Sequence, residues 1–450
     1  MSATHVESGQ STETAVTGRQ TLWRNADFLT FWSGETLSLL GSQVTSLALP
    51  LTAVLVFHAT STQVGLLRFL QLVPYLGLAM VFGAWVDRAR RKRVMLLANG
   101  ARMVLVGLVP LLSATHLLTL PLLLALACAI GVFSVLFDVS WMSFVPTLVR
   151  DPARYPEANQ KLGTTSSAAD VAGPGLAGAL IGALSAPIAL AADAASYLVS
   201  LATLLWIRTP EARPEPAARA GAQAPAKRRL VREIREGLHW VFADRVLRPL
   251  ALIAPFCNFS MVSVWTLFLL YAVRVQGLTA AQVGVVFSAS SVGGLLGAAV
   301  SRRVIDRFRI GRVYAVAMSA IFAGPVLIPL ASGSRTAVTA FFVLSFFVGY
   351  LGLGVANVVM VSLRQTLTPP ALMGRMNAAF RTVLFGGGSL GGLGAGLIAD
   401  ALGLRAGVAL LAVASAVMVL PVLLSPVSRL RELPRPAGSA GPPGSAAVAG

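Results

Sequence analysis

Apolar residues are grouped along the chain in long runs separated by short polar segments. Most runs exceed the roughly 20 residues that an α-helix needs to cross the hydrocarbon core of a bilayer. Glycine and proline occur inside the runs, which membrane helices tolerate better than soluble ones do. The pattern predicts an all-α membrane protein with twelve spans, at residues 28–57, 62–86, 94–114, 120–145, 161–184, 187–207, 248–273, 280–301, 312–331, 336–363, 376–399 and 405–427.

The composition agrees with a protein that lies in a lipid bilayer. Of 450 residues, 56% are hydrophobic and only 12% charged, whereas soluble domains carry roughly 25% charged residues. A net charge of +18 would suggest nucleic-acid binding in a soluble protein, but here its distribution indicates otherwise, and we expect no nucleic-acid partner. Cys128 and Cys257 both lie in apolar runs, so we expect neither a disulfide framework nor a metal or other cofactor.

The basic residues alternate between the two sides of the predicted spans. All but six of the 36 Lys and Arg lie in the termini and in the loops after spans 2, 4, 6, 8 and 10. Three of the six, Arg274, Arg335 and Arg405, lie in the opposite loops, and the other three lie inside spans. Because basic residues resist translocation, the basic side and both termini are predicted to be cytoplasmic. The excess of Arg over Lys is typical of a GC-rich bacterial genome, which places the chain in a bacterial inner membrane.

The spans and the polar segments divide the chain into five parts. We expect a cytoplasmic tail at 1–25, a six-helix bundle at 26–207, a cytoplasmic linker at 208–247, a second six-helix bundle at 248–428 and a disordered tail at 429–450. Within the linker, residues 228–246 place apolar side chains on one helical face and mostly arginines opposite. This pattern predicts a basic amphipathic helix on the membrane surface.

The two predicted bundles repeat one another in sequence. An offset of 219 residues lays Gln63-Val64-Gly65 on Gln282-Val283-Gly284 and Asp87-Arg88 on Asp306-Arg307. An offset of 218 residues lays Gly173 on Gly391 and Ala177-Gly178 on Ala395-Gly396. An even number of spans per repeat gives both copies the same orientation. A parallel repeat of this kind places a substrate cavity between its halves, open alternately to either side.

The loop after the second span reads Gly83-Ala84-Trp85-Val86-Asp87-Arg88-Ala89-Arg90-Arg91-Lys92-Arg93. It resembles the loop signature of the major facilitator superfamily, and the resemblance extends over about residues 22 to 428. It implies the major facilitator fold of two parallel six-helix bundles. Arg90 stands where the signature has a glycine, and Arg302 stands at the position equivalent to Gly83 in the second copy.

The resemblance also implies a gating latch, in which an acid in the basic loop pairs with basic groups and with a neighbouring helix end. The residues assigned to it are Gly83, Asp87, Arg88 and Arg91, with Asp306 and Arg307 in the second copy. The alternative is a simple positive-inside anchor.

Several stretches are similar to the branch that contains enterobactin exporters and macrolide efflux proteins. They include Phe31-Trp32-Ser33-Gly34-Glu35, Asp193-Ala194-Ala195-Ser196-Tyr197 and Arg375-Met376-Asn377-Ala378. The fifth span contains Gly173-Pro174-Gly175-Leu176-Ala177-Gly178, which resembles the core of the glycine-proline motif of proton-antiporting exporters, although the upstream glycine spacing differs. Gly173, Pro174 and Gly178 are therefore assigned to an antiporter-like bend, with ordinary small-residue packing as the alternative.

Ionisable residues inside spans are candidates for function, because burying them costs several kcal/mol unless they are paired or hydrated. The proton-coupling candidates are Glu35, Asp138, Asp170 and Asp193. Glu35 ranks first, because its own span has no basic residue. The ion-pair candidates are Arg102 with Asp138, Arg68 with Asp193, and Arg381. For Asp138 and Asp193 a static structural pair is the alternative, for Asp170 helix packing, and for Arg381 lipid headgroup binding.

The remaining cavity candidates are polar or aromatic side chains within spans: Trp32, Gln71, Asn258, Trp265 and Asn357. A cavity with few fixed charges favours amphiphilic over highly polar substrates. The function predicted is secondary active transport, namely proton-coupled export of a small amphiphilic drug, antibiotic or siderophore by a monomer. The alternatives are a lipid or lysophospholipid carrier and a non-transporting membrane partner. The sequence contains no catalytic constellation, so we do not expect an enzyme.

Overall fold

The computed structural model describes residues 22–86, 89–149, 151, 154–211, 226–369 and 372–432, and throughout these segments the secondary structure is helical, without a strand. Eleven helices in the described part are long and apolar enough to cross a membrane. The second predicted span, 62–86, is covered by two shorter helices, α2 (Ser61–Leu72) and α3 (Pro74–Val86). They meet at Val73, where Pro74, which lacks an N–H, begins the new helix. The predicted helical membrane fold is confirmed, whereas the second of the twelve expected spans is not covered by a single helix long enough to cross a membrane.

The first half of the chain packs as one set of helices. Besides α2 and α3, it consists of α1 (Ala26–Leu55), α4 (Arg91–Ala114), α5 (Leu120–Leu148), α6 (Tyr155–Leu184) and α7 (Ala186–Trp206). Within it, α1 lies against α6 and α7, and α5 lies against α3 and α4.

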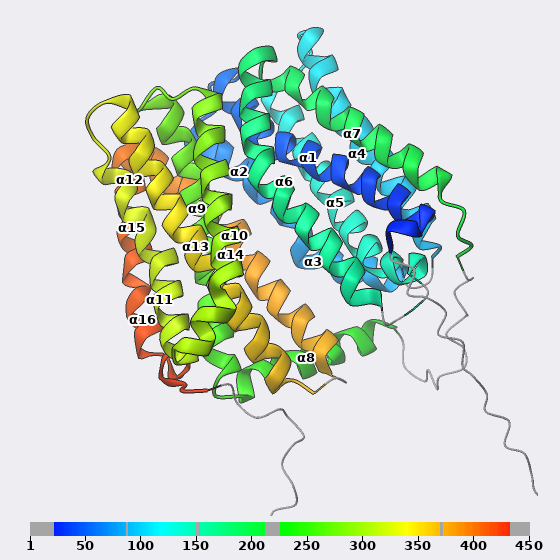
Figure 1. Cartoon of the computed structure of the whole chain (residues 1–450). Helices are drawn as coiled ribbons and strands as arrows, with labels where there is room; N and C mark the ends of the chain where they lie inside the picture. The colour runs from blue at the N-terminus through cyan, green and yellow to red at the C-terminus, as the bar shows by residue number, and fades with distance from the viewer. Residues whose placement is uncertain are drawn as a thin grey trace, which may run out of the picture.

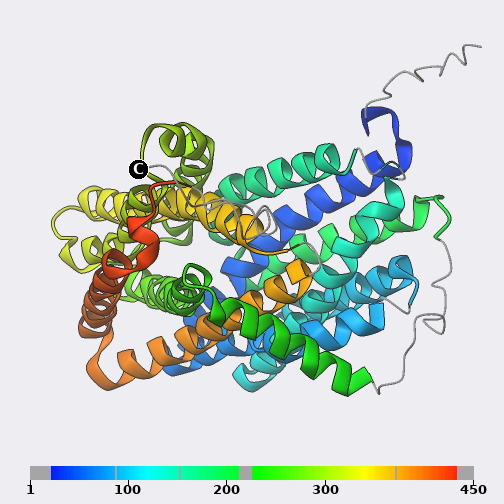
Figure 2. The same cartoon turned by 90° about the horizontal axis from the view of Figure 1, so that it is seen from below.

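The second half forms a similar set beside the first (Figure 1). Its helices are α9 (Leu247–Arg274), α10 (Ala280–Arg307), α11 (Ile310–Ala323), α12 (Leu327–Leu330), α13 (Arg335–Leu367), α14 (Met373–Leu402), α15 (Leu404–Val417) and α16 (Val419–Leu424). The predicted amphipathic segment at 228–246 forms α8 (Ala226–Ala243). In Figures 1 and 2, α8 runs across the ends of the other helices, against α9 and α14.

The two halves touch mainly through two helix pairs, α2 with α14 and α6 with α10. Gly65 of α2 packs on the carbonyl oxygen of Gly392, and at the equivalent place Gly284 of α10 packs on the carbonyl oxygen of Pro174. Small residues let backbones approach closely in membranes. The sequence repeat therefore corresponds to a repeated helix contact.

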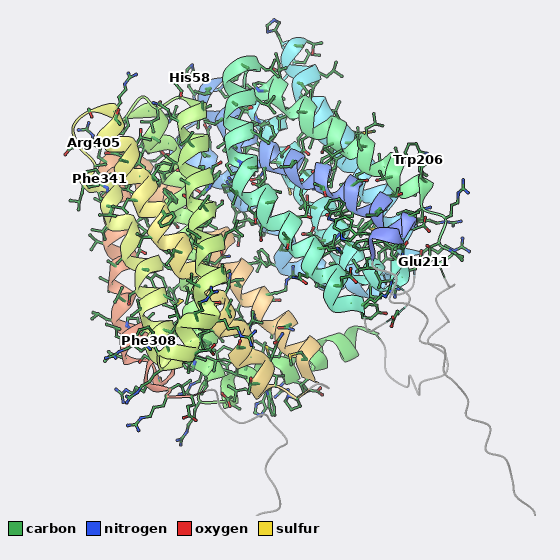
Figure 3. All side chains as sticks on the ribbon, viewed as in Figure 1. His58, Trp206, Glu211, Phe308, Phe341 and Arg405 are labelled. Carbon is green, nitrogen blue, oxygen red and sulfur yellow. The ribbon has the colours of Figure 1, made fainter. Side chains whose placement is uncertain are left out.

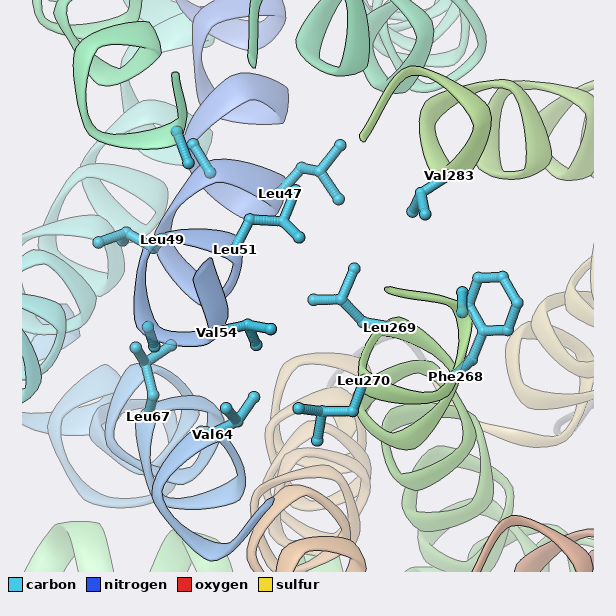
Figure 4. Packing of buried hydrophobic residues seen from close by; sticks show 14 of the residues in the cluster. Leu47, Leu49, Leu51, Val54, Val64, Leu67, Phe268, Leu269, Leu270 and Val283 are labelled. Atoms are coloured by element: carbon cyan, nitrogen blue, oxygen red, sulfur yellow. The ribbon is translucent and has the colours of Figure 1, made fainter. Parts of the chain in front are cut away.

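The starts of α2 and α10 are also built alike. The side chain of Thr60 caps α2 and that of Thr279 caps α10, each forming a reciprocal capping box with a glutamine, Gln63 or Gln282. Such a box satisfies two backbone donors that a helix start otherwise leaves free. Beside these starts, Figure 4 shows apolar side chains of the first half, such as Leu51, facing those of the second, such as Leu269.

The halves are joined at one end of the bundle, the end that carries His58 and Arg405 in Figure 3. There the carboxylate of Asp400 accepts hydrogen bonds from the backbone N–H groups of Ser61 (3.0 Å) and Thr62 (2.9 Å). Arg274 donates to the carbonyl oxygen of Ala59 at 2.5 Å. Toward the other end, where Phe308 is labelled, the two sets of helices diverge.

Candidate functional site

Two adjoining cavities of about 330 and 450 Å³ lie between the halves. They share Ser46 of α1, Trp265 of α9 and Tyr350 of α13 as lining residues. Most of the remaining lining is apolar, and the polar or charged side chains added by each cavity are few: Arg68, Asn258, Ser260 and Ser345 in the first, and Gln43, Ser167, Asp170, Ser291 and Asn357 in the second. Volumes of this size are typical of small-molecule sites.

Arg68 of α2 contributes the cation of the first cavity. Its guanidinium lies 3.6 Å from the centre of the Trp265 ring, a cation–π contact between the halves. It donates to the side chain of Gln71 (3.2 Å) and to the backbone carbonyl oxygen of Ser46 (2.9 Å). Its Nε atom is buried and has no hydrogen-bond partner among the described residues. The protein therefore holds this cation by its face and two of its N–H donors.

Asp170 of α6 contributes the carboxylate of the second cavity. It accepts a hydrogen bond of 2.6 Å from Gln43 of α1. Gly173, one turn further along α6, packs directly on the aliphatic part of Gln43. The backbone N–H of Gly175 donates to Ser288 of α10 at 2.8 Å, and Gly178 packs on the start of α10. The glycine-proline segment thus lies where α6 meets both α1 and the other half.

Arg102 of α4 lies inside the first half, away from the two cavities. It donates to the hydroxyl of Tyr197 at 2.6 Å and more weakly to Ser42 and Asn99, at 3.3 and 3.4 Å. Its guanidinium also lies 4.3 Å from the centre of the Tyr197 ring. The hydrogen-bond partners of this cation are thus neutral, and its buried Nε atom has no partner among the described residues.

Two ion pairs were expected between residues at similar depths in the membrane, Arg102 with Asp138 and Arg68 with Asp193. Neither pair is formed in the described part of the chain. Asp193 accepts hydrogen bonds from Thr45 and Ser196, and its expected partner Arg68 points instead toward Trp265. Asp138, the expected partner of Arg102, accepts a hydrogen bond from the hydroxyl of Tyr75 at 2.7 Å. The reason is geometric: equal depth does not fix the direction in which a side chain leaves its helix.

Asp138 and Tyr75 lie next to the second half. The Tyr75 ring stacks on Phe385 of α14, with ring centroids 4.7 Å apart. Arg381, also of α14, lies 5.7 Å from the Phe385 ring and contacts the sulfur of Met142 in α5 at 3.6 Å. Arg381 is exposed and interacts electrostatically with Asp138. This group of side chains links α3, α5 and α14.

Glu35 differs from the other three intramembrane acids. It is buried in α1, with 7% of its surface exposed, and lies within electrostatic range of Arg102 and Asp138. Asp138, Asp170 and Asp193 each accept a side-chain hydrogen bond, whereas no hydrogen bond to the Glu35 carboxyl is found among the described residues. Its protonation is therefore the least fixed by neighbouring donors.

The predicted latch is only partly described. Asp87 and Arg88 lie outside the described residues, and a side chain added at Gly83 would meet open space. The backbone N–H groups of Arg91 and Lys92 donate to the carboxylate of Glu211 at 2.6 and 3.2 Å, which caps the start of α4. In the second copy, Asp306 and Arg307 are both exposed at the end of α10. The latch stays a prediction.

The structure places most of the predicted cavity residues near the cavities. Asn258, Trp265 and Asn357 line them, and Gln71 holds Arg68. Trp32 lies elsewhere, donating to Thr165 between α1 and α6 at 2.8 Å.

Sequence reasoning missed several polar residues of the site, among them Gln43, Ser46 and Tyr350. Gln43 and Ser46 follow Glu35 along α1, and Tyr350 lies in the middle of an apolar span. Polar positions inside a span are the signal that could have identified them.

Comparisons with known proteins agree with this architecture. Residues 31–392 match the family model of the Major Facilitator Superfamily. A protein named multidrug efflux pump Tap, from Mycolicibacterium fortuitum, is 28% identical over 424 residues, covering 87% of this chain and 93% of the relative. The uncharacterized MFS-type transporter YfiS of Bacillus subtilis (strain 168) is 25% identical over 385 residues, covering 85% and 89% of the two chains.

Solved structures share the fold at low sequence identity. The nucleoside transporter NupG matches with a TM-score of 0.69 and 13% identity, covering 89% of this chain and 99% of that one. A bacterial homologue of the iron transporter ferroportin, in an inward-facing state, matches with a TM-score of 0.65 and 18% identity, covering 90% and 99%. With the family model matching most of the chain, this protein belongs to the Major Facilitator Superfamily of membrane transporters.

Proposed function

We propose that this transporter exports a small amphiphilic molecule across the bacterial plasma membrane in exchange for protons. The observation that carries the proposal is the cavity between the halves, with aromatic and aliphatic walls and few polar groups. Apolar walls with isolated polar groups suit an amphiphile better than a sugar, which needs many polar partners. The related protein named as a multidrug efflux pump supports the same substrate class.

The distribution of basic residues supports an inward-facing arrangement. The halves are joined at the end that carries Arg274 and Arg405, where basic residues are rare, and diverge at the end that carries the basic loops. The basic end is the cytoplasmic one by the positive-inside rule. The cavity in this state then receives substrate from the cytoplasm or the inner leaflet, and a single chain encloses it.

Glu35 is the residue to which we assign the proton. A carboxyl that is buried, near a cation and not fixed by hydrogen bonds can exchange a proton when its surroundings change from dry to wet. Glu35 meets these conditions beside Arg102. Asp138, hydrogen-bonded to Tyr75 close to the second half, is the second candidate.

A lipid or lysophospholipid carrier is the second candidate function. It needs a cationic group for the headgroup, and Arg68 places one cation in the cavity wall. Lysophosphatidylcholine added as a competitor distinguishes the two candidates, because only a lipid carrier is saturated by it.

The test of export is uptake into inverted membrane vesicles that contain the full chain and an imposed proton gradient. The fluorescent amphiphiles ethidium and ciprofloxacin serve as probes. Gradient-dependent accumulation that stops when a protonophore is added is the expected result. Folded protein that moves neither probe, but takes up the lipid competitor, contradicts drug export in favour of lipid transport.

A further inference from the structure

The cavity between the halves contains two opposite charges that do not pair with each other. Arg68 lines one compartment and Asp170 the other. No ion pair of either residue is found in the part of the chain that the structure describes. Asp170 is exposed and Arg68 is half-buried, so a transported molecule that supplies the opposite charges can reach both groups.

Each charge is held in a way that leaves donors or acceptors free. A guanidinium has five N–H donors. In Arg68 two of them are used by Gln71 and Ser46, and the indole ring of Trp265 covers one flat face of the guanidinium. The carboxylate of Asp170 accepts one hydrogen bond, from Gln43, whereas two oxygens can accept about four. Neither group is saturated by the protein.

The residues that hold the two charges lie within one turn of α1. Gln43, which holds Asp170, and Ser46, which holds Arg68, are three residues apart on α1. These anchoring points are therefore about 5 Å apart along the helix. Tyr350 lines both compartments and interacts electrostatically with both charges.

Aromatic side chains lie between the charged ends. Trp265 lines both compartments and stacks on Phe287, with ring centroids 5.3 Å apart. A flat ring system suits this region, because aromatic rings gain from offset stacking.

We propose that the cavity is a two-ended site for a compact aromatic zwitterion, in which Arg68 binds the carboxylate of the ligand and Asp170 binds its ammonium group. This inference rests on the proposed transport function and names the substrate class within it. Charged hydrogen bonds contribute enough for roughly a tenfold difference in affinity at each end.

Equilibrium binding to the full chain in lipid nanodiscs tests the proposal without a proton gradient. Three probes share one ring system and differ in charge: ciprofloxacin, which is zwitterionic; its methyl ester, which keeps only the ammonium; and its N-acetyl derivative, which keeps only the carboxylate. Ligand fluorescence gives each Kd. Ciprofloxacin is expected to bind about tenfold more tightly than either derivative.

Variants assign each charge to its partner. Arg68→Gln should weaken ciprofloxacin binding about tenfold, to the affinity of the ester, and leave the ester unchanged. Asp170→Asn should weaken ciprofloxacin binding to the affinity of the N-acetyl derivative and leave binding of the N-acetyl derivative unchanged. Arg68→Lys, which keeps the cation, should restore most of the selectivity. Arg405→Gln and Glu432→Gln, exposed charges outside the cavity, are the matched controls.

Equal affinities for the three probes, no saturable binding of any of them, or variants that weaken all three alike would overturn the two-ended site. Export can fail separately: charge-selective binding without gradient-driven efflux contradicts the proposed coupling and leaves the site standing. Gradient-driven efflux with equal rates for all three probes would contradict the two-ended site and leave the proposed coupling standing.

Discussion

The carboxylate of Asp400 in α14 accepts a hydrogen bond of 3.0 Å from the backbone N–H of Ser61, the first residue of α2 in the other half. The same carboxylate accepts a second one, of 2.9 Å, from Thr62. A negative charge at a helix start is stabilised both by these N–H groups and by the helix dipole. The contact therefore stabilises the arrangement in which this end of the transporter is closed.

Asp400→Ala is expected to shift the equilibrium toward opening at this end by about tenfold, because two hydrogen bonds to a charged group are lost. Spin labels at His58 and Arg405, both exposed, on a background with Cys128 and Cys257 replaced by Ser, report the separation. Longer distances in the variant support the role. Glu432→Ala, at an exposed acid, is the control, and an unchanged distance distribution for Asp400→Ala would contradict the prediction.

Gly284→Ala is expected to impair closure of the same end, because the added methyl meets the carbonyl oxygen of Pro174. The matched control is Gly182→Ala, where a Cβ meets no atom within 4 Å. Both substitutions gain helix propensity equally, so a difference between them isolates the contact. The spin-label distances and the rate of gradient-driven efflux measure it. Equal behaviour of the two variants would show that the close approach is dispensable.

Glu35→Gln is expected to abolish gradient-driven efflux, since the amide cannot release a proton. Equilibrium binding of ciprofloxacin should be unchanged, because Glu35 does not line the cavities. Vesicle efflux and nanodisc binding are measured on the same preparation, with the exposed Glu432→Gln as control. Full efflux by Glu35→Gln would assign the proton to another acid, with Asp138→Asn the next variant to measure.

Arg102→Gln is expected to destabilise the folded protein by about 2 kcal/mol, because hydrogen bonds between a charged donor and neutral buried partners are lost. Arg102 is 8% exposed and donates to Tyr197, whose hydroxyl also contacts Ser42. Thermal unfolding in detergent is the measurement. Arg68→Gln should lower the Tm less, because Arg68 faces a cavity. A Tm for Arg102→Gln equal to that of the unaltered protein would refute the structural role.

The helices could be predicted from the sequence because their signals are local. Apolar run lengths, alternating basic loops and the repeated Gln-Val-Gly triplets all lie within single segments, and α1, α2 and α10 begin within two residues of the predicted spans. Of the ionisable residues inside spans, Glu35 and Arg102 are buried and Arg68 lines a cavity, whereas Asp170 is exposed, and their predicted functions stay predictions.

The partners of those charges could not be predicted, because they depend on the rotation of each helix about its axis. A rotation of about 100° per residue separates neighbours, so similar depths for Arg102 and Asp138 left their directions open. Asp400 was missed for another reason. It lies beyond the predicted end of its span at 399, where an acid looks like an ordinary boundary residue, and its function depends on the tertiary contact with α2.

The offset that relates the two halves places Gly182 where Asp400 would be expected. The α6–α10 contact therefore has the glycine packing of the α2–α14 contact without its carboxylate. The two halves are related by a repeat, but their two contacts at this end are unequal: the α2–α14 contact resists separation more than the α6–α10 contact. We expect the halves to part first between α6 and α10 and last between α2 and α14. The departing molecule would then leave by a lateral route on the α6 side, not along the central axis.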